Sequence, residues 1–480
     1  MNKQLLLLPK HYPVTCHTDH VGTGSTFVAI KGLRDDGTGY ITHALQKGAT
    51  TIITEQTPEQ ANIERLCATH NARLIIVPNA RQALAEESSK QLGYPCQKLK
   101  IIGITGTKGK TTTTYLTEHI LRSAGYKTAI ISTIVNRILD EAESSTNTTP
   151  NSDYLQMFFA ECVKRCVEYV VMEVSSHALD FYRVHGVTFA GIGFTNLAPE
   201  HMDFYATLND YFASKARLFS HIKAEGTIVI NADNEWGIKA ISIAEHHATN
   251  MHATTLSFGQ QPTAKAPFAI QQTSFDGIAI TLHNQTLHCP TLFGTYNCYN
   301  LTMATLLSLA ANISLASIAA ALKTFPGVPG RLQRHILKNG AHAFVDYAHN
   351  PSSFEQVLST LRQHTANLIV VFGCGGNKDT TKRPVMGKLA AAFADKVIVT
   401  DDNPRYENRQ TIINEIIAGI PQEHVNKVIT EPDRRKAIAL AAALSQPGSI
   451  IALLGKGHET YYLIEGKTYH FDDFEEIRSF

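Results

Sequence analysis

The sequence has no excess of either charge and no hydrophobic run long enough to cross a membrane. Its 43 lysines and arginines oppose 42 aspartates and glutamates, giving a formal net charge of +1, so no overall basic field indicates a nucleic acid or an anionic membrane as a partner. Hydrophobic residues make up 44% of the chain, but no apolar tract reaches the roughly 18 residues that a membrane span requires. We therefore predict a soluble globular protein with no nucleic-acid or membrane partner.

The sequence also lacks a CxxC pair and a long apolar segment near its start. The apolar run at 5–8 is followed by Pro9 and Lys10 and is shorter than the hydrophobic region of a signal peptide. The eight cysteines have no spacing that indicates a metal site or a disulfide framework. We therefore expect reduced thiols and a cytoplasmic location.

The length of the chain and the position of a proline- and glycine-rich cluster indicate three domains. A chain of 480 residues corresponds to about three domains of typical size. Short apolar runs at 26–30 and 50–54 and a helix-like segment at 41–48 predict a small α/β unit, and a Pro/Gly cluster at 326–330 marks a later junction. The predicted domains, all of the α/β class, are a small N-terminal domain at 1–95, a central P-loop-type nucleotide-binding domain with a mostly parallel sheet at 96–328, and a Rossmann-like C-terminal domain at 329–480.

A glycine-rich turn between a strand and a helix is the strongest local signal. Apolar residues at 99–104 predict a strand, 105–110 reads TGTKGK, and 111–124 predicts a helix. Glycines let backbone N–H groups approach phosphate oxygens, and the start of a helix supplies positive potential. Lys110 can reach the β- and γ-phosphates and Thr111 can ligate Mg²⁺. The turn lacks the first glycine of a full Walker A motif, yet it predicts a nucleotide phosphate site.

Other polar residues follow apolar segments in the same way. Glu173 lies near the end of the segment 169–174, where a carboxylate beside a phosphate loop would serve a metal ion. Taken alone, His201 and Lys215 would be ordinary surface or solvated residues. Three loops, GCGG, DDNPR and GKGHE, follow the apolar segments 368–372, 396–400 and 449–454. Because open α/β sheets bind ligands at the carboxyl ends of their strands, these loops are candidate binding loops.

Together these motifs resemble the ATP-dependent Mur ligases, and among them the UDP-N-acetylmuramoyl-tripeptide synthetases, over nearly the whole chain. The resemblance rests on TGT-x-GKT at 105–111, E-V-S-S-H-A-L at 173–179, F-T-N-L-x-x-x-H-x-D at 194–203, N-x-Y-N at 297–300, P-G-R at 329–331, D-Y-A-H-x-P at 346–351, G-C-G-G at 373–376, D-N-P-R at 402–405 and G-K-G-H-E at 455–459. It implies an ATP- and Mg²⁺-dependent, monomeric amide ligase of peptidoglycan biosynthesis, which activates its acceptor as an acyl phosphate.

The resemblance also implies roles for individual residues. The catalytic residues would be Lys110, Glu173, His201 and Lys215. ATP would be held by Gly106, Thr107, Lys108, Gly109, Lys110, Thr111, Thr112, Asn300, Arg331 and Asp346. Magnesium would be held by Thr111, Glu173, His201 and Lys215, the last as a carbamate. The UDP-MurNAc-peptide would be held by Thr18, Asn147, Thr148, Thr149, Ser175 and Arg183. The incoming amino acid would be held by Lys378, Asp402, Asn403, Pro404, Arg405, Gly455 and Glu459.

Arg405 indicates which amino acid is added. An arginine presents a planar fork to a carboxylate, and meso-diaminopimelate differs from lysine by a second carboxylate. Lysine-adding relatives resemble this segment but lack the arginine. The sequence therefore favours addition of meso-diaminopimelate to the D-Glu of UDP-MurNAc-L-Ala-D-Glu.

Several positions depart from the family pattern. The N-terminal D-S-R signature that helps to hold the uridine nucleotide reads His17-Thr18-Asp19, so its arginine is lost. Phe181 stands where glutamine is frequent, Lys378 where an arginine is usual, and Lys108 replaces the usual asparagine of the phosphate loop. Most of these departures concern the two substrate pockets.

These departures leave other functions open. The ligase could add L-lysine or another amine, or use a different acceptor, and a non-catalytic nucleotide-binding paralogue is a further alternative. Folylpolyglutamate and cyanophycin synthetases share the TGT-x-GK loop, but E-V-S-S-H-A-L together with D-N-P-R resembles the tripeptide synthetases. The intact set of Lys110, Glu173, His201 and Lys215 disfavours the non-catalytic alternative.

Overall fold

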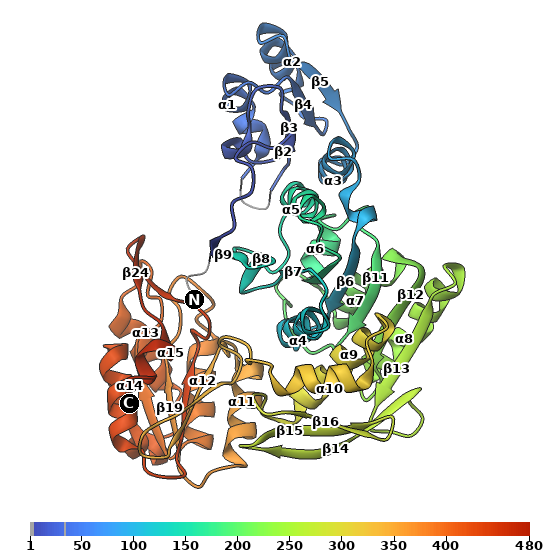
Figure 1. Cartoon of the computed structure of the whole chain (residues 1–480). Coiled ribbons are helices and arrows are strands. Elements are labelled where there is room, and N and C mark those ends of the chain that lie inside the picture. The colour runs from blue at the N-terminus through green and yellow to red at the C-terminus, as the bar shows by residue number, and fades with distance from the viewer. Residues whose placement is uncertain (1–3, 33–34) are drawn as a thin grey trace. The chain divides into compact units, whose positions relative to one another are not determined.

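The computed structural model describes residues 4–32 and 35–480, which form two compact units (Figure 1). The first contains the chain up to Ile270 with Ile280–Leu287 and Tyr299–Lys323, and the second contains Gln271–Ala279, His288–Cys298 and Thr324–Phe480. Each unit has its own hydrophobic cores. Among the described residues, no helix has the length and apolar character needed to cross a membrane.

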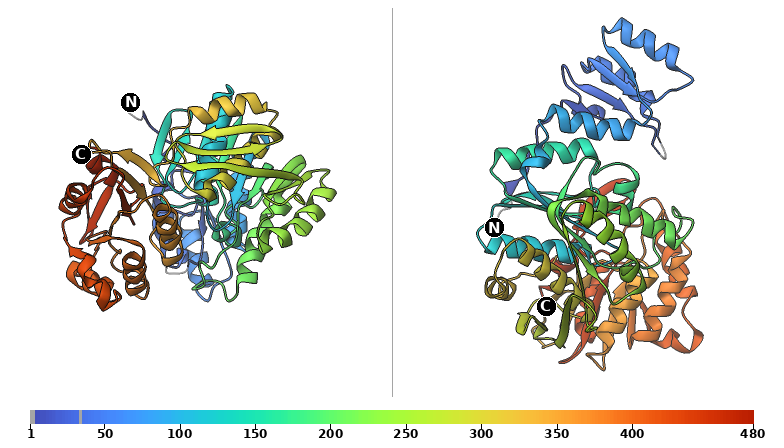
Figure 2. Two further views of the ribbon diagram at one scale, coloured as in Figure 1. Left: turned by 90° about the horizontal axis from the view of Figure 1, so that it is seen from below. Right: turned by 90° about the vertical axis from the view of Figure 1, so that its right-hand side faces the viewer.

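A four-stranded parallel sheet opens the first unit. Its strands, in sheet order, are β2 (Val14–Thr15), β3 (Thr26–Ala29), β4 (Thr51–Thr54) and β5 (Arg73–Ile76). Its helices are α1 (Ile41–Gln46), α2 (Gln60–Thr69) and α3 (Ala80–Gln91). Successive strand residues face opposite sides, so Phe27 packs with α1 and α2 whereas Val28 packs with α3. The right-hand view of Figure 2 shows these strands in blue with their helices, and the segments expected at 26–30, 41–48 and 50–54 are present.

A twelve-stranded sheet, most of which lies in the first unit, has β6 (Lys100–Thr105) near its middle, paired in parallel with β10 (Tyr169–Glu173) and β11 (Phe189–Phe194). Every residue of β6 after Lys100 is buried, as expected for a parallel strand covered on both faces. The strand order is β1-β9-β8-β7-β10-β6-β11-β12-β13-β14-β15-β16. The other strands are β1 (Gln4–Leu5), β7 (Thr128–Ile131), β8 (Val135–Ile138), β9 (Glu141–Ser144), β12 (Ile222–Asn231), β13 (Thr254–Gly259), β14 (Ala266–Ser274), β15 (Gly277–Leu282) and β16 (Gln285–Cys289).

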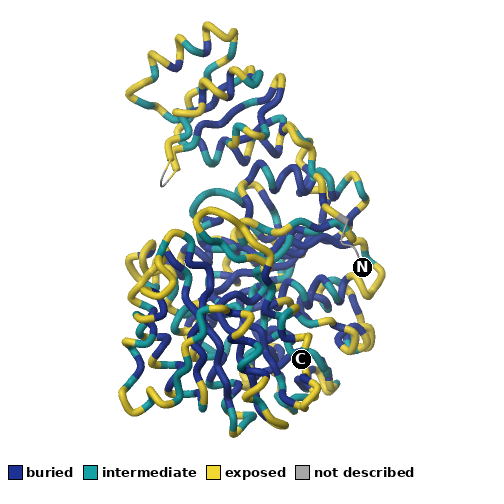
Figure 3. The backbone as a smooth tube through the Cα atoms, turned by 90° about the vertical axis from the view of Figure 1, so that its left-hand side faces the viewer, coloured by how far each residue is buried: buried dark blue, intermediate teal, exposed yellow. Residues whose placement is uncertain are grey.

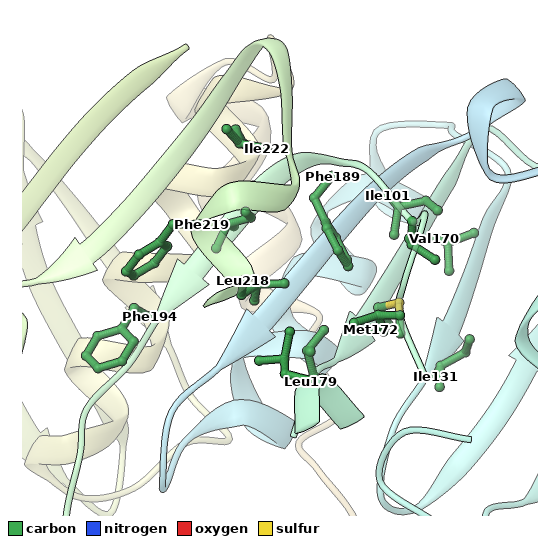
Figure 4. Packing of buried hydrophobic residues seen from close by; sticks show 14 of the residues in the cluster. Ile101, Ile131, Val170, Met172, Leu179, Phe189, Phe194, Leu218, Phe219 and Ile222 are labelled. Carbon is green, nitrogen blue, oxygen red and sulfur yellow. The ribbon is translucent and has the colours of Figure 1, made fainter. Parts of the chain in front are cut away.

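Helices and aromatic residues cover this sheet. The helices are α4 (Lys110–Ser123), α5 (Ser152–Lys164), α6 (Ser176–Asp180), α7 (Leu208–Ala216), α8 (Glu235–Asn250), α9 (Thr295–Ala310) and α10 (Leu315–Lys323). In Figure 4, Ile101, Val170 and Met172 of the strands lie near Leu179 and Phe189 in one buried cluster. Each such side chain contributes about 1.5–3 kcal/mol when fully buried. This core holds the carboxyl ends of β6 and β10 in a fixed register.

The second unit contains a six-stranded sheet. In sheet order its strands are β17 (Gln333–Ile336), β18 (His342–Asp346), β22 (Ile450–Leu454), β19 (Leu368–Phe372), β20 (Lys396–Val399) and β21 (Val428–Thr430), and only β17 is antiparallel. The helices α11 (Pro351–Arg362), α12 (Lys382–Phe393) and α13 (Arg409–Ala418) contribute to one core, and α14 (Arg434–Leu444) and α15 (Asp473–Ile477) to the other. The alternation of Val370 and Val371 between these cores shows that the sheet is covered on both faces. β19 and β22, at the middle of the sheet, are buried throughout, and buried backbone is dark blue in Figure 3.

The predicted α/β class with mostly parallel sheets is confirmed. The strands expected at 99–104, 169–174, 368–372, 396–400 and 449–454 are present with ends that differ by one residue at most. A hairpin of β23 (Tyr461–Ile464) and β24 (Lys467–His470) follows β22. The domain boundaries at 95/96 and 328/329 stay predictions.

Candidate active site

The glycine-rich turn forms a cradle between β6 and α4. Gly106 has φ of 137° and Gly109 has φ of 86°, a region that L side chains rarely adopt. A Cβ at Gly106 would collide with Thr195 Oγ1, and one at Gly109 would collide with Asn300 Oδ1. Because the turn opens directly into the start of α4, its backbone provides a site suited to an anion.

Two residues of the F-T-N-L motif hold this turn. Thr195 Oγ1 donates to Lys108 O at 2.6 Å, and Asn196 Nδ2 donates to the same oxygen at 3.1 Å. In return, Lys108 N donates to Asn196 Oδ1 at 3.0 Å. The motif that follows β11 therefore fixes the backbone of the phosphate loop, a role that its sequence alone did not indicate.

Two lysines meet at the cradle. Lys110 Nζ donates to Gly106 O at 2.8 Å and to Thr107 O at 2.9 Å, and Lys215 Nζ donates to Gly106 O at 2.9 Å. Lys215 lies on α7 with 1% of its surface exposed, and its ammonium is 4.3 Å from the centre of the Tyr211 ring. Burial, and secondarily the charge of Lys110, lowers the pKa of Lys215 well below its ordinary value.

Of the two other predicted catalytic residues, His201 lies near Tyr211, the ring that Lys215 contacts, whereas Glu173 is held by Thr133. The buried Glu173 accepts hydrogen bonds from Thr133 N at 2.8 Å and from Thr133 Oγ1 at 3.2 Å. His201, with φ of 59°, has its ring 4.9 Å from that of His177. Over residues 4–32 and 35–480, no three His, Cys, Asp or Glu side chains gather in a group that could hold a metal by themselves.

The segment 147–149 connects Glu173 to the predicted peptide-binding residues. Thr148 Oγ1 lies 3.1 Å from Thr133 Oγ1, the hydroxyl that donates to Glu173. Thr149 Oγ1 accepts from Ser175 N at 3.0 Å, and Thr149 O accepts from Arg183 Nη1 at 2.8 Å. The structure therefore brings four residues predicted to hold the UDP-MurNAc-peptide next to the predicted metal ligand.

A pocket of about 750 Å³ lies beside these residues in the first unit. The lining residue Cys16 is held by Asp153 of α5, whose carboxylate accepts from Thr15 Oγ1 at 2.8 Å and from Cys16 N at 3.1 Å. The residues that line the pocket are Cys16, His17, Ile30, Gly32, Asp35, Gly37, Tyr40, Arg81, Leu84, Asn147, Asn151, Ser152, Phe181 and Arg183. Asn147 and Arg183 were predicted from the sequence, whereas Thr18 is not among the lining residues.

Three motifs of the second unit meet around Tyr347. Tyr347 N donates to Gly330 O at 2.9 Å, its ring lies 4.7 Å from that of His458, and the Arg331 guanidinium carbon is 5.2 Å from the ring centre. Asp346 accepts from two backbone N–H groups at 2.7 and 2.9 Å. Burial lowers the pKa of His458 to about 3, with the charge of Arg331 as a second cause. Arg331 and Asp346 thus lie in the second unit, whereas Asn300 lies with the phosphate loop in the first.

Arg405 is held in an unusual backbone conformation. Its φ is 55°, its N–H donates to Leu463 O at 2.9 Å and its carbonyl accepts from Glu465 N at 2.7 Å. Its Nη1 donates to Gly376 O at 2.8 Å. Lys378 is exposed and flanks the neighbouring glycine of the same loop. The β23–β24 hairpin therefore fixes the position of Arg405.

A buried lysine joins this hairpin to the D-N-P-R loop. The side chain of Lys456 is fully buried, and its Nζ donates to Tyr461 O at 2.6 Å and to Asn403 Oδ1 at 3.3 Å. Leu463 N also donates to Asn403 Oδ1, at 2.9 Å. The amide nitrogen of Asn403 is thereby directed to Glu459 Oε2, to which it donates at 2.7 Å.

The carboxylates of this region are partly buried. Burial, with the charge of Asp402 as the second cause, raises the pKa of Glu459 to about 6, while Lys456 and the hydrogen bond from Asn403 act in the opposite direction. Asp402 and Pro404 are buried, and a Cβ at Gly455 would lie 2.8 Å from Asp402 Oδ2. Four of the seven predicted amino-acid ligands, Asp402, Asn403, Gly455 and Glu459, therefore lie close to one another, and the charge of Arg405 also acts on Glu459.

Comparison with known proteins identifies the family. Residues 104–308 match the Mur ligase middle domain, and residues 330–457 match the Mur ligase, glutamate ligase domain. The chain is 38% identical over 469 residues to the UDP-N-acetylmuramoyl-L-alanyl-D-glutamate–2,6-diaminopimelate ligase of Aquifex aeolicus, covering 97% of this chain and 92% of the relative. The chain belongs to the Mur ligase family. The resemblance found in the sequence is thus confirmed, and the protein is a Mur ligase enzyme.

Further relatives and solved structures are similar to this chain over most of its length. The enzyme of the same name from Thermosynechococcus vestitus is 38% identical, with 95% of this chain and 90% of the relative covered. A solved structure of a ligase of that name has a TM-score of 0.68 and 32% identity, over 98% of this chain and 94% of that chain. A folylpolyglutamate synthase from Mycobacterium tuberculosis, at 17% identity and a TM-score of 0.60, shares the fold.

Within this Mur ligase, sequence reasoning did not find several residues that shape the candidate site. Arg81 and Phe181 line the pocket of the first unit, Asn196 holds the phosphate loop, and Lys456 orients Asn403. Phe181 was noticed only as a departure, and Lys456 only as part of a motif. Arg81 has no signal in the sequence, because its helix lies outside every motif.

Lys456→Met should destabilise the second unit. Methionine nearly matches the volume of the side chain but leaves the Tyr461 and Asn403 oxygens without their buried cation, and breaking such an interaction costs about 3 kcal/mol. Differential scanning calorimetry of the whole chain measures the effect. The matched control is Lys467→Met on the exposed strand β24, which should leave the melting temperature within about 1 °C. Equal melting of the two variants would contradict a structural role for Lys456.

Proposed function

We propose that the protein joins meso-2,6-diaminopimelate to the D-Glu carboxylate of UDP-N-acetylmuramoyl-L-alanyl-D-glutamate, using ATP and Mg²⁺, in peptidoglycan biosynthesis. The observation that carries the proposal is the hydrogen-bonded cluster of Arg405, Asn403 and Glu459 in a chain 36–38% identical over nearly its full length to ligases named for this reaction. A protein that uses ATP and this nucleotide-linked substrate belongs in the cytoplasm.

The phosphate loop of the first unit is suited to ATP. Gly106 and Gly109 carry no Cβ where the turn passes close to Thr195 and Asn300, and Lys110 stands at the start of α4. Lys110 places its ammonium at the cradle, where it donates to Gly106 O and Thr107 O. We assign the triphosphate to this place because charge neutralisation is the main requirement of phosphoryl transfer.

The oxygen donors beside the loop fit a magnesium ion. Thr111 follows Lys110 on α4, and the Glu173 carboxylate is buried and already oriented by Thr133. Mg²⁺ prefers carboxylate, hydroxyl and phosphate oxygens and, when bound, neutralises charge on the transferring phosphate. We propose Thr111 and Glu173 as its protein ligands, with His201 and a Lys215 carbamate at a second position.

The chemistry follows from the weakness of a carboxylate as an electrophile. The D-Glu carboxylate attacks the γ-phosphorus of ATP and releases ADP, which leaves an acyl phosphate. The amine of diaminopimelate then attacks the acyl carbon, loses a proton and displaces inorganic phosphate to form the amide. Lys110 stabilises the phosphate oxygens through the first step, and Arg183 with Thr149 orients the peptide end.

The second unit supplies the amine pocket. The guanidinium of Arg405 offers a planar fork to the carboxylate that distinguishes diaminopimelate from lysine. Glu459, held by Asn403, offers a negative charge to an ammonium group. We propose that Lys378 approaches the same substrate as a point charge, because it flanks the glycine loop that Arg405 covers.

The test is ADP release from ATP and Mg²⁺ with UDP-MurNAc-L-Ala-D-Glu in the presence of meso-diaminopimelate, L-lysine or no amine, with mass detection of the product. Turnover only with diaminopimelate is expected. Turnover with lysine would retain the reaction but refute the role of Arg405 in selection. No product with either amine would overturn the acceptor assignment and direct attention to His17, Thr18 and Asp19.

The affinity for the amine should depend on the ionisation of Glu459. Its pKa is raised to about 6, so it is protonated below that pH and loses its attraction for an ammonium. The KM for diaminopimelate should therefore be constant above about pH 7 and rise about tenfold by pH 5. The groups that face Glu459 are Asp402, Lys456, Asn403 and Arg405. Glu459→Gln is the control, and a KM profile of unchanged shape in that variant would contradict the assignment.

A further inference from the structure

Two arginines from different parts of the first unit converge on one aromatic ring. The guanidinium carbon of Arg81, on α3, is 4.6 Å from the centre of the Phe181 ring, and that of Arg183 is 5.9 Å from the same centre. All three residues line the pocket of about 750 Å³. Because a cation over a ring face uses the face of the guanidinium, its N–H edges stay available for an anion.

Neither guanidinium is in direct contact with a carboxylate in the described chain, although the charge of Glu55 acts on Arg81. Arg81 Nη2 donates to the backbone oxygen of Lys31 at 3.1 Å, and Arg183 Nη1 donates to that of Thr149 at 2.8 Å. No salt bridge joins either arginine to an acidic side chain among residues 4–32 and 35–480, although Asp35 lines the same pocket. The Nε of Arg183 is buried and has no hydrogen-bond partner.

This arrangement has an energetic cost that a ligand would remove. Burial lowers the pKa of Arg81 and that of Arg183, and the charge of Arg81 contributes to the lowering at Arg183. A pair of like charges in a partly buried pocket is unfavourable unless an anion lies between them or beside them. A buried Nε without a partner is a second, independent sign of a missing acceptor.

We propose that Arg81 binds an anionic group of the nucleotide-linked substrate, together with Arg183, and that Phe181 holds the two guanidiniums in place. This inference rests on the proposed function and adds a substrate-binding residue to it. It also accounts for two departures from the family pattern, Phe181 and the signature His17-Thr18-Asp19. The pocket has lost the arginine of the His17-Thr18-Asp19 signature, and Arg81 supplies a cation beside Cys16 and His17.

The anionic group is either the diphosphate or a carboxylate of the sugar-peptide, since both present oxygens that accept paired N–H groups. The walls of the pocket are joined in the fold, because α3 lies next to α5, the helix whose Asp153 holds Cys16. A substrate bound to Arg81 and Arg183 therefore bridges α3 and the segment that follows α6.

The experiment compares wild type, Arg81→Ala, Arg81→Lys and Lys90→Ala. Lys90 is an exposed cation on the same helix and serves as the matched control. Calorimetry measures the affinity for UDP-MurNAc-L-Ala-D-Glu, and competitive inhibition measures that for UDP and for uridine. We expect Arg81→Ala to weaken binding of the full substrate about 10- to 100-fold, Arg81→Lys to lie between it and wild type, and Lys90→Ala to match wild type.

The competitors identify the anion. Loss of UDP affinity with uridine unchanged supports contact with the diphosphate, and loss for the full substrate alone supports contact with a carboxylate. If Arg81→Ala binds the full substrate and UDP as tightly as wild type does, the inference is overturned. The proposed function would still stand in that case, provided that wild type turns over. Absence of binding by wild type would instead overturn the proposed function. Phe181→Leu, which keeps an apolar side chain but removes the ring, should weaken binding about threefold to tenfold, and the KM for ATP should stay constant in every variant.

Discussion

Lys215→Ala is expected to abolish ligation, with turnover at least about 1,000-fold below wild type, while the affinity for ADP changes by less than about twofold. Lys215 is buried, donates to Gly106 O and lies beside Lys110, which donates to the same oxygen. Lys110 and the backbone of the cradle remain in the variant. Nucleotide binding should therefore survive while transfer of the γ-phosphate to the D-Glu carboxylate fails.

The physical reason lies in the lowered pKa of the Lys215 amine. A neutral amine is nucleophilic and can add CO₂ to form a carbamate with release of a proton, which converts a cation next to Lys110 into an anion. The resemblance to Mur ligases implies this modification, and the burial of the side chain explains why the amine would be reactive. An anion at this position would remove the repulsion between two ammonium groups that share one carbonyl.

Three measurements separate this role from a structural one. The melting temperature of Lys215→Ala should fall by no more than about 10 °C, because the variant loses the packing of one buried side chain while Gly106 O keeps its bond to Lys110. Lys239→Ala, an exposed lysine on α8 of the same unit, should retain full turnover. Wild type freed of bicarbonate should lose activity and regain it when bicarbonate is added. Undiminished turnover of Lys215→Ala would exclude a metal-binding carbamate.

The local elements of this fold could be predicted from the sequence because their signals are local. The apolar run 99–104, the glycines of TGTKGK and the helix that follows are each decided within a few residues of the chain. The positive φ of Gly106 and Gly109 is likewise determined locally, by the glycine residues themselves. Parallel strands that are buried on both faces are likewise continuous hydrophobic runs, so five strand segments were located within one residue.

The parts that sequence reasoning did not find are contacts between distant elements. Arg81 and Phe181 are 100 positions apart, and Lys456 reaches Asn403 across 53 positions. The hydrophobic periodicity of the sequence does not predict such pairs, because they form only when distant helices and loops pack together. The motif residues illustrate the same limit: Asn196 was quoted within F-T-N-L, but only the structure shows that it holds the phosphate loop.

Arg405→Ala is expected to lower kcat/KM for meso-diaminopimelate about 100- to 1,000-fold while the KM for ATP stays within about twofold. A charged fork that pairs with a carboxylate in a partly buried site leaves that carboxylate without a partner when it is removed. Arg405→Lys keeps the charge but loses the paired geometry, so it should recover only a part of the activity. Both variants keep a non-glycine residue at φ of 55°, so the backbone constraint is matched between them.

Comparison of the activity with diaminopimelate and with L-lysine shows whether Arg405 recognises the second carboxylate. Arg405→Ala should lose more activity towards diaminopimelate than towards L-lysine, because lysine has no second carboxylate to lose a contact. Lys378→Ala is the matched control, since its exposed ammonium flanks the same glycine loop without the hydrogen bond that Arg405 makes to Gly376 O. If Lys378→Ala instead causes the larger loss, the point charge recognises the carboxylate and Arg405 serves to fix the loop. If neither variant alters the preference, the second carboxylate is bound outside this pocket.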